Sequence, residues 1–204
     1  MKINFSYNEW GLALNEQRFS PSEIVQLAIN VGKDFTWHPL GFVMCKLSQE
    51  NEKNIRLHIW PNSSEHVQEP QWLIHDHMFD LKSWVLSGKI ENIEYEIASD
   101  FPIYSIYQAS YEQDKSILHR TEQDLSIKVK NKSVVSSGQI YEIASGILHQ
   151  SISLSNSTAV TVCETIDRLD KNPIIAGDIK GRASYSYTRA TVCDEDLQDI
   201  IGKI

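Results

Sequence analysis

FVMCKL (42–47), NIRLHIW (54–60), WLIHDHMF (72–79) and WVLSGKIENIEYEI (84–97) open a series of short apolar or alternating runs. The series continues to residue 166 through IYSIYQASY, LSIKVK, QIYEIA and TAVTVCETI. Runs of this length and alternation are typical of strands. Turn residues separate them, among them Pro61–Ser64, Ser87-Gly88 and Ser155–Ser157. The pattern predicts a meander of roughly eight strands.

So many short strands with so little helix between them predict an all-β fold, because closing an antiparallel sheet removes its exposed edges. A double-sheet jelly roll fits best, and an immunoglobulin-like sandwich is the alternative. We expect a single domain over residues 1–204, with the barrel at 41–190.

Helical patterns flank the barrel. Ser20-Pro21-Ser22-Glu23 combines a capping hydroxyl, a first-turn proline and an early acid, and predicts a helix over 21–33. One or two helices are expected in the segment 1–40. In the tail, 191–204, DEDLQDIIGKI predicts a short helix capped by Asp194.

Charge and composition exclude several partners. The net charge of −8 offers no basic stripe for a phosphate backbone or an anionic membrane. No apolar stretch approaches the ~18 residues of a membrane span, and the N-terminus has no apolar core behind a basic start. Three widely spaced cysteines argue against a disulfide framework. We therefore expect a cytoplasmic protein whose partners include neither nucleic acid nor membrane.

His75 and His77 end a strand-like run. Because side chains alternate along a strand, both imidazoles face the same side and can share one metal ion. The pair is followed by a strand that closes on Ser87-Gly88. A second glycine turn and strand, 138–148, lead to His149.

These two stretches resemble the cupins, whose first motif is His-x-His, an acid and a glycine turn, and whose second leads to a third histidine. The resemblance covers roughly residues 54–166 and implies a double-stranded β-helix with His75, His77 and His149 as metal ligands. Within the cupins the strings IRLHIW, IHDH, VLSGKIEN and GILHQSISLSNSTAVTV look most like thiol dioxygenases of the cysteine dioxygenase type. The resemblance also implies pairing of two chains through their sheets, and so a homodimer.

The sequence departs from the family pattern at several positions. Lys82 stands where most cupins have a glutamate ligand, which favours a three-histidine site. By this resemblance Thr161, Cys163 and Thr165 stand where thiol dioxygenases have a Ser-His-Tyr run, and Ser145 replaces the usual proline. The sequence therefore matches the family better at the metal ligands than at the residues that bind the thiol substrate.

Two cationic residues are candidates for binding substrate charge. Arg56 shares one face of its strand with His58, and its guanidinium suits a carboxylate; the alternative is that both coat the outside. Lys82 either points inward to an anion or lies at the rim. Asp76 and Asp80 either hold an imidazole N–H or face solvent.

His38 and His119 are interpreted as structural or surface residues. Free cysteine usually packs as a small hydrophobe, which is the interpretation for Cys163.

Three neutral imidazoles leave positions open for substrate and O2 on a divalent metal. The first hypothesis is a non-haem iron(II) dioxygenase acting on a small anionic or thiol metabolite, with Arg56 and Lys82 as catalytic candidates. Zinc or manganese at the same ligands would favour the second, a metal-dependent isomerase, epimerase or lyase; nickel is a further candidate metal for the site. The third is a cupin that binds a small ligand without chemistry.

Overall fold

A computed structural model describes residues 5–62, 66–154, 156 and 158–204. The predicted turns at 61–64 and 155–157 lie partly outside the described residues. The elements, in chain order, are α1 (Tyr7–Asn15), α2 (Pro21–Asn30), β1 (Phe35–Trp37), β2 (Val43–Glu50), β3 (Lys53–Trp60), β4 (Phe79–Ser87), β5 (Lys89–Ile97), β6 (Ile103–Glu112), β7 (Lys115–Ser136), β8 (Ile140–Ile143), β9 (His149–Ser153), β10 (Ala159–Asp167), β11 (Ile174–Gly177), β12 (Ser184–Thr188) and α3 (Asp194–Ile201).

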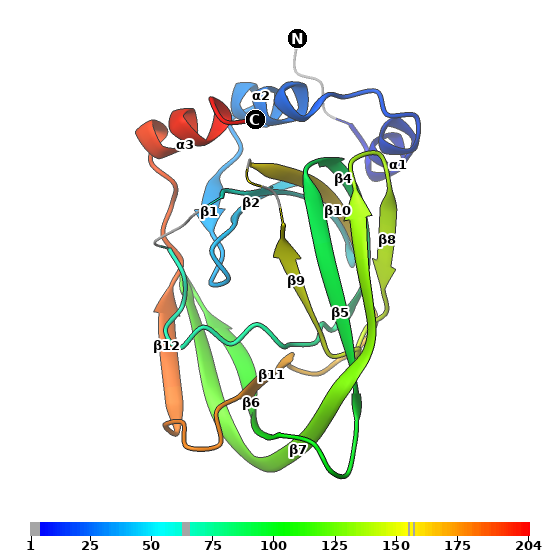
Figure 1. The fold of residues 1–204 in the computed structure, drawn as a ribbon. Helices are drawn as coiled ribbons and strands as arrows, with labels where there is room; N and C mark the ends of the chain where they lie inside the picture. The colour runs from blue at the N-terminus through cyan, green and yellow to red at the C-terminus, as the bar shows by residue number, and fades with distance from the viewer. Residues whose placement is uncertain (1–4, 63–65, 155, 157) are drawn as a thin grey trace.

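The strands form two antiparallel sheets (Figure 1). The first has the order β1-β2-β3-β10-β4-β8, and the second has the order β11-β6-β7-β5-β9 with β12 paired to β7. Strands distant in the sequence are neighbours, as β3 and β10 are, which is the non-sequential pairing of a jelly roll. The predicted all-β, cupin-like jelly-roll fold is confirmed.

The segment before β4 closes the second sheet. His75 exchanges backbone hydrogen bonds with His149 at the start of β9, with N···O distances of 2.9 and 2.8 Å. On the other side, Asp76 N donates to Ile174 O, and Ala176 N donates to Ile74 O. Residues 74–76 therefore fill the gap between β9 and β11.

Strand β3 is buried on both faces, although its sequence alternates. Ile55, Leu57 and Ile59 pack in a hydrophobic cluster with residues of all three helices. Arg56 and His58, on the opposite face, line an interior cavity. The interpretation that Arg56 and His58 coat the outside is wrong. The helices cover the apolar face of β3, so its polar face lies inside the barrel.

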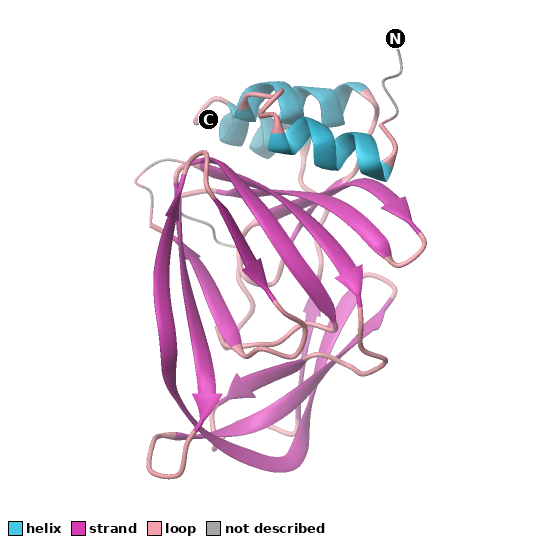
Figure 2. Ribbon diagram, turned by 90° about the vertical axis from the view of Figure 1, so that its right-hand side faces the viewer, coloured by secondary structure: helices cyan, strands magenta, loops and turns pink. Residues whose placement is uncertain are grey.

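The three helices gather over the first sheet at the end of the molecule where both termini lie (Figures 1 and 2). Helix α2 has the predicted capping box between Ser20 and Glu23, and it ends at Asn30, earlier than expected. Helix α3 is capped by Cys193, one residue before the predicted cap. Within the described residues, no helix is long and apolar enough to span a bilayer.

Candidate metal centre

Three imidazoles meet inside the barrel: His75 and His77 from the segment before β4, and His149 from the start of β9. One ligand atom from each lies within 4.8 Å of the other two. Nε2 of His75 is 3.1 Å from Nε2 of His77. Two nitrogens each about 2.1 Å from one ion, at roughly right angles, would be about 3 Å apart, so this pair fits a shared metal.

Backbone carbonyls set which ring nitrogen of two histidines is free. Nδ1 of His75 is 2.7 Å from Leu73 O, and Nδ1 of His149 is 2.9 Å from Ile147 O. A carbonyl can only accept, so each Nδ1 carries the proton and each Nε2 keeps its lone pair. This is the tautomer that ligation through Nε2 requires.

Burial keeps the three imidazoles neutral. Desolvation lowers the pKa of His149 to about 3 and lowers the pKa of His75 as well. The pKa of His77 is lowered by burial and by its neighbours His149 and His75. Neutral histidine is the form that binds metal, so the residues present fit a divalent ion.

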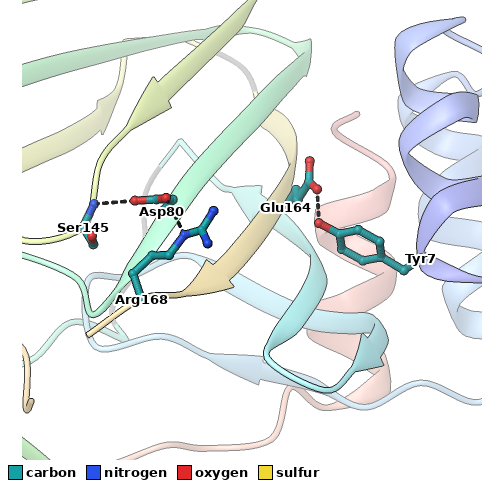
Figure 3. Close-up of polar contacts among 5 residues, drawn as sticks. All are labelled: Tyr7, Asp80, Ser145, Glu164 and Arg168. Atoms are coloured by element: carbon teal, nitrogen blue, oxygen red, sulfur yellow. Dashed lines mark hydrogen bonds and ion pairs between the residues drawn. The ribbon is translucent and has the colours of Figure 1, made fainter. Parts of the chain in front are cut away.

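The two acids near the pair act on the backbone around the site and contact no imidazole nitrogen. The Asp76 side chain is 1% exposed and accepts from Ile174 N at 2.6 Å and from Lys171 Nζ at 2.8 Å. Asp80 accepts from Ser145 N at 3.0 Å and pairs with Arg168 Nε at 2.8 Å (Figure 3). Both carboxylates hold the loops that flank the histidines.

The histidines form part of the wall of a cavity of about 400 Å³. Arg56 also lines it, with its guanidinium carbon 5.0 Å from the centre of the Phe79 ring. The same ring stacks on His77 at 4.4 Å, so Arg56 lies on the histidine side of the cavity. Arg56 Nε is buried and has no hydrogen-bond partner among the described residues.

Lys82 lies on the other face of β4. Its ammonium is 5.1 Å from the Trp84 ring centre and 3.8 Å from Glu142, and its side chain is 34% exposed. Phe79 and Leu81 line the cavity, whereas Lys82 does not. Alternate residues of a strand share a face. Phe79 and Leu81 therefore point into the cavity, and Lys82, between them and Ser83, points to the outside of the barrel.

Sequence reasoning left three cavity residues outside the candidate site. His38 is half-buried and His58 is buried, both in the cavity wall, and Arg189 lines the cavity, where its Nε donates to Ser116 Oγ at 3.0 Å. His58 shares a strand face with Arg56, which was the available signal. His119 is exposed on β7, as expected.

Comparison with known proteins gives only distant structural likeness. No family model and no curated protein matches the chain. Hydroxypropylphosphonic acid epoxidase from S. wedmorenis has 8% identity and a TM-score of 0.39 over 66% of this chain and 55% of its own. Hydroquinone 1,2-dioxygenase PnpCD has 11% identity and a TM-score of 0.40 over 76% of this chain and 76% of its own.

The Drosophila melanogaster CENP-C cupin domain has 12% identity and a TM-score of 0.38 over 78% of this chain and 98% of its own. The chain thus spans about half of the epoxidase and nearly all of the cupin domain. With TM-scores below 0.5, these likenesses carry no information about substrate or reaction.

Proposed function

We propose that the protein is a non-haem iron(II) dioxygenase that acts on a small organic anion or thiol within the barrel. The observation that carries the proposal is the convergence of three neutral imidazoles on one point of a cavity that is also lined by a half-buried arginine. Bound iron(II) with open positions would supply a place for an anionic substrate and O2 side by side. Both oxygen atoms enter the product, so the overall reaction needs no external reductant.

Each residue of the site has a defined task in this proposal. His75, His77 and His149 hold the metal, and Leu73 O and Ile147 O orient two of the rings. Arg56 binds the negative charge of the substrate, since its guanidinium lines the cavity beside Phe79. Lys82 has no role in it, because its side chain lies outside the cavity.

The first test is metal content. Protein purified without added metal or an affinity tag that carries nickel is analysed for bound elements beside its His75→Ala and His149→Ala variants. We expect near one iron per chain in the wild type and none in either variant. His119→Ala, which alters an exposed histidine on β7, should retain the iron.

Oxygen consumption then separates the alternatives. Uptake of one O2 per substrate, abolished by His149→Ala, supports the dioxygenase. Bound zinc or manganese with turnover but no O2 uptake would indicate an isomerase or lyase instead. Absence of metal from the wild type, or metal retained by both variants, would refute the three-histidine site.

A further inference from the structure

The three imidazoles of the metal centre are not held in the same way. Nδ1 of His75 and Nδ1 of His149 each contact a backbone carbonyl, at 2.7 and 2.9 Å. Nδ1 of His77 is buried and has no hydrogen-bond partner among the described residues. The backbone of His77 is fixed, since its carbonyl accepts from Gly146 N at 2.9 Å. Its ring, however, must be oriented by contacts other than a hydrogen bond to Nδ1.

Phe79 makes a contact that orients this ring. The Phe79 and His77 rings are stacked, with centroids 4.4 Å apart and planes inclined by 18°. His75 and His149 also lie beside His77, but their planes are inclined to its plane by 69° and 64°. The lone pair of Nε2 lies in the plane of the imidazole, so a nearly parallel neighbour that limits the tilt of the ring also sets the direction of the ligand atom.

The Phe79 ring is itself restrained. Phe79 begins β4, where it is paired with Asp167 of β10 in the register of the sheet. The guanidinium carbon of Arg56, on β3, lies over its ring at 5.0 Å from the centroid, which is a cation–π distance. The side chain is half-buried at the cavity wall. A strand position and a cationic neighbour therefore hold the ring that packs on His77.

We propose that Phe79 is a positioning residue of the metal centre. Its ring holds the plane of the His77 imidazole in place of the hydrogen bond that the other two histidines make. This inference rests on the proposed function only in taking His75, His77 and His149 as ligands of one ion. It concerns metal binding and not the reaction, so its test needs neither substrate nor O2.

The size of the effect follows from the kind of contact. A leucine at position 79 keeps apolar volume but presents no flat surface, so the His77 ring can tilt and its Nε2 lone pair turns away from the ion. An aromatic pair is worth about three- to tenfold in an equilibrium constant. We therefore expect Phe79→Leu to raise the Kd for a divalent ion by about three- to tenfold.

Cobalt(II) titration of the metal-free full-length chain measures this change, because the visible absorption of bound cobalt(II) reports its coordination geometry. Phe79→Leu should raise the Kd and alter the visible bands of the saturated site. Phe79→Met, a second side chain without a ring, should do the same. Phe79→Tyr keeps the ring and should restore the wild-type Kd and bands. Urea unfolding of the metal-free variants shows that each is folded.

Phe42→Leu is the matched control. Phe42 also stacks on a cavity histidine, with its ring 4.2 Å from that of His38 and inclined by 11°, but His38 is outside the three-histidine cluster. The same substitution there removes the same kind of contact without touching a ligand. It should lower the free energy of unfolding and leave the Kd for cobalt(II) and the visible bands unchanged.

Proton NMR of the cobalt(II)-loaded chain separates positioning from a general loss of structure. The ring N–H protons of ligating histidines are shifted by the ion out of the ordinary range, so the wild type should show three such signals. In Phe79→Leu the signal of His77 should move, whereas those of His75 and His149, held by backbone carbonyls, should stay. A role in structure alone would move all three.

The outcomes distinguish this inference from the proposed function. A wild-type Kd and unchanged signals in Phe79→Leu would overturn the role of Phe79 and leave the dioxygenase intact. Equal weakening by Phe42→Leu, movement of all three signals, or failure of Phe79→Tyr to restore binding would overturn it too. The expected cobalt(II) results in a protein that consumes no O2 when loaded with iron would do the reverse. A wild type that binds no cobalt(II) would overturn both.

Discussion

Asp76 shows how one residue can support a site that it does not touch. Its carboxylate lies between the two histidines in sequence, yet it binds Ile174 N and Lys171 Nζ. These contacts hold the start of β11 against residues 74–76, the segment that carries His75. The position of the first imidazole therefore depends on a buried charge whose hydrogen bonds go to Ile174 and Lys171.

Asp76→Asn should weaken metal binding because it replaces one of two acceptor oxygens with an amide N–H2 beside the Lys171 ammonium. We expect a loss of about 1–3 kcal/mol in the free energy of unfolding, the cost of disturbing a buried charged hydrogen bond. Metal affinity, followed by competition with a chelator, should fall by up to about tenfold. Asp100→Asn, at an exposed position, is the control; equal effects of both substitutions would contradict this role.

At the scale of the element, alternation predicted which strands form but not which face of each lies inside. Arg56 and Lys82 are both cations on alternating strands, and the sequence makes them equally good candidates for binding substrate charge. The structure separates them because helices cover one face of the first sheet, so the polar face of β3 turns inward and Lys82 of β4 turns outward. The histidine cluster was predictable because its spacing carries chemistry, whereas the closure of the second sheet by residues 74–76 depends on contacts distant in sequence.

Helix α1 is tied to the first sheet by a hydrogen bond from Tyr7 to the carboxylate of Glu164 on β10 (Figure 3). Burial raises the pKa of Glu164. An acid whose pKa is higher in the folded state favours folding while protonated, and this contribution is lost as pH rises through the folded pKa. At neutral pH the ionised Glu164 carboxylate beneath α1 therefore lowers the free energy of unfolding.

Glu164→Gln should therefore be more stable than the wild type at pH 7, because the amide oxygen still accepts from Tyr7 without a charge. The difference in stability between the variant and the wild type should shrink toward pH 4, where the wild-type carboxyl becomes protonated. Urea unfolding of both proteins at pH 7 and pH 4 measures this difference. Tyr7→Phe removes the donor and should cost about 1 kcal/mol at pH 7; a gain from Glu164→Gln that grows toward acid would contradict the account.

At the scale of the whole molecule, the barrel interior concentrates buried and half-buried histidines. His38, His58, His75, His77 and His149 all line one cavity, and burial lowers the pKa of each. For His58 and His149 the pKa falls to about 3. The fold that brings ligands together for a metal therefore also brings together groups that resist protonation.

The metal-free protein should lose stability steeply as the pH falls below about 6.5, the pKa of histidine in the unfolded chain. Between that pH and about 3, the histidines of the unfolded chain bind protons, whereas the imidazoles in the folded cavity stay neutral. The free energy of unfolding therefore decreases as the pH decreases. Urea unfolding at intervals from pH 7.5 to 4.5 gives the slope. His58→Phe removes one such group and should flatten the curve, whereas His119→Phe, at an exposed position on β7, should leave the slope unchanged. A slope that both substitutions alter equally would mean that the cavity histidines do not govern acid sensitivity.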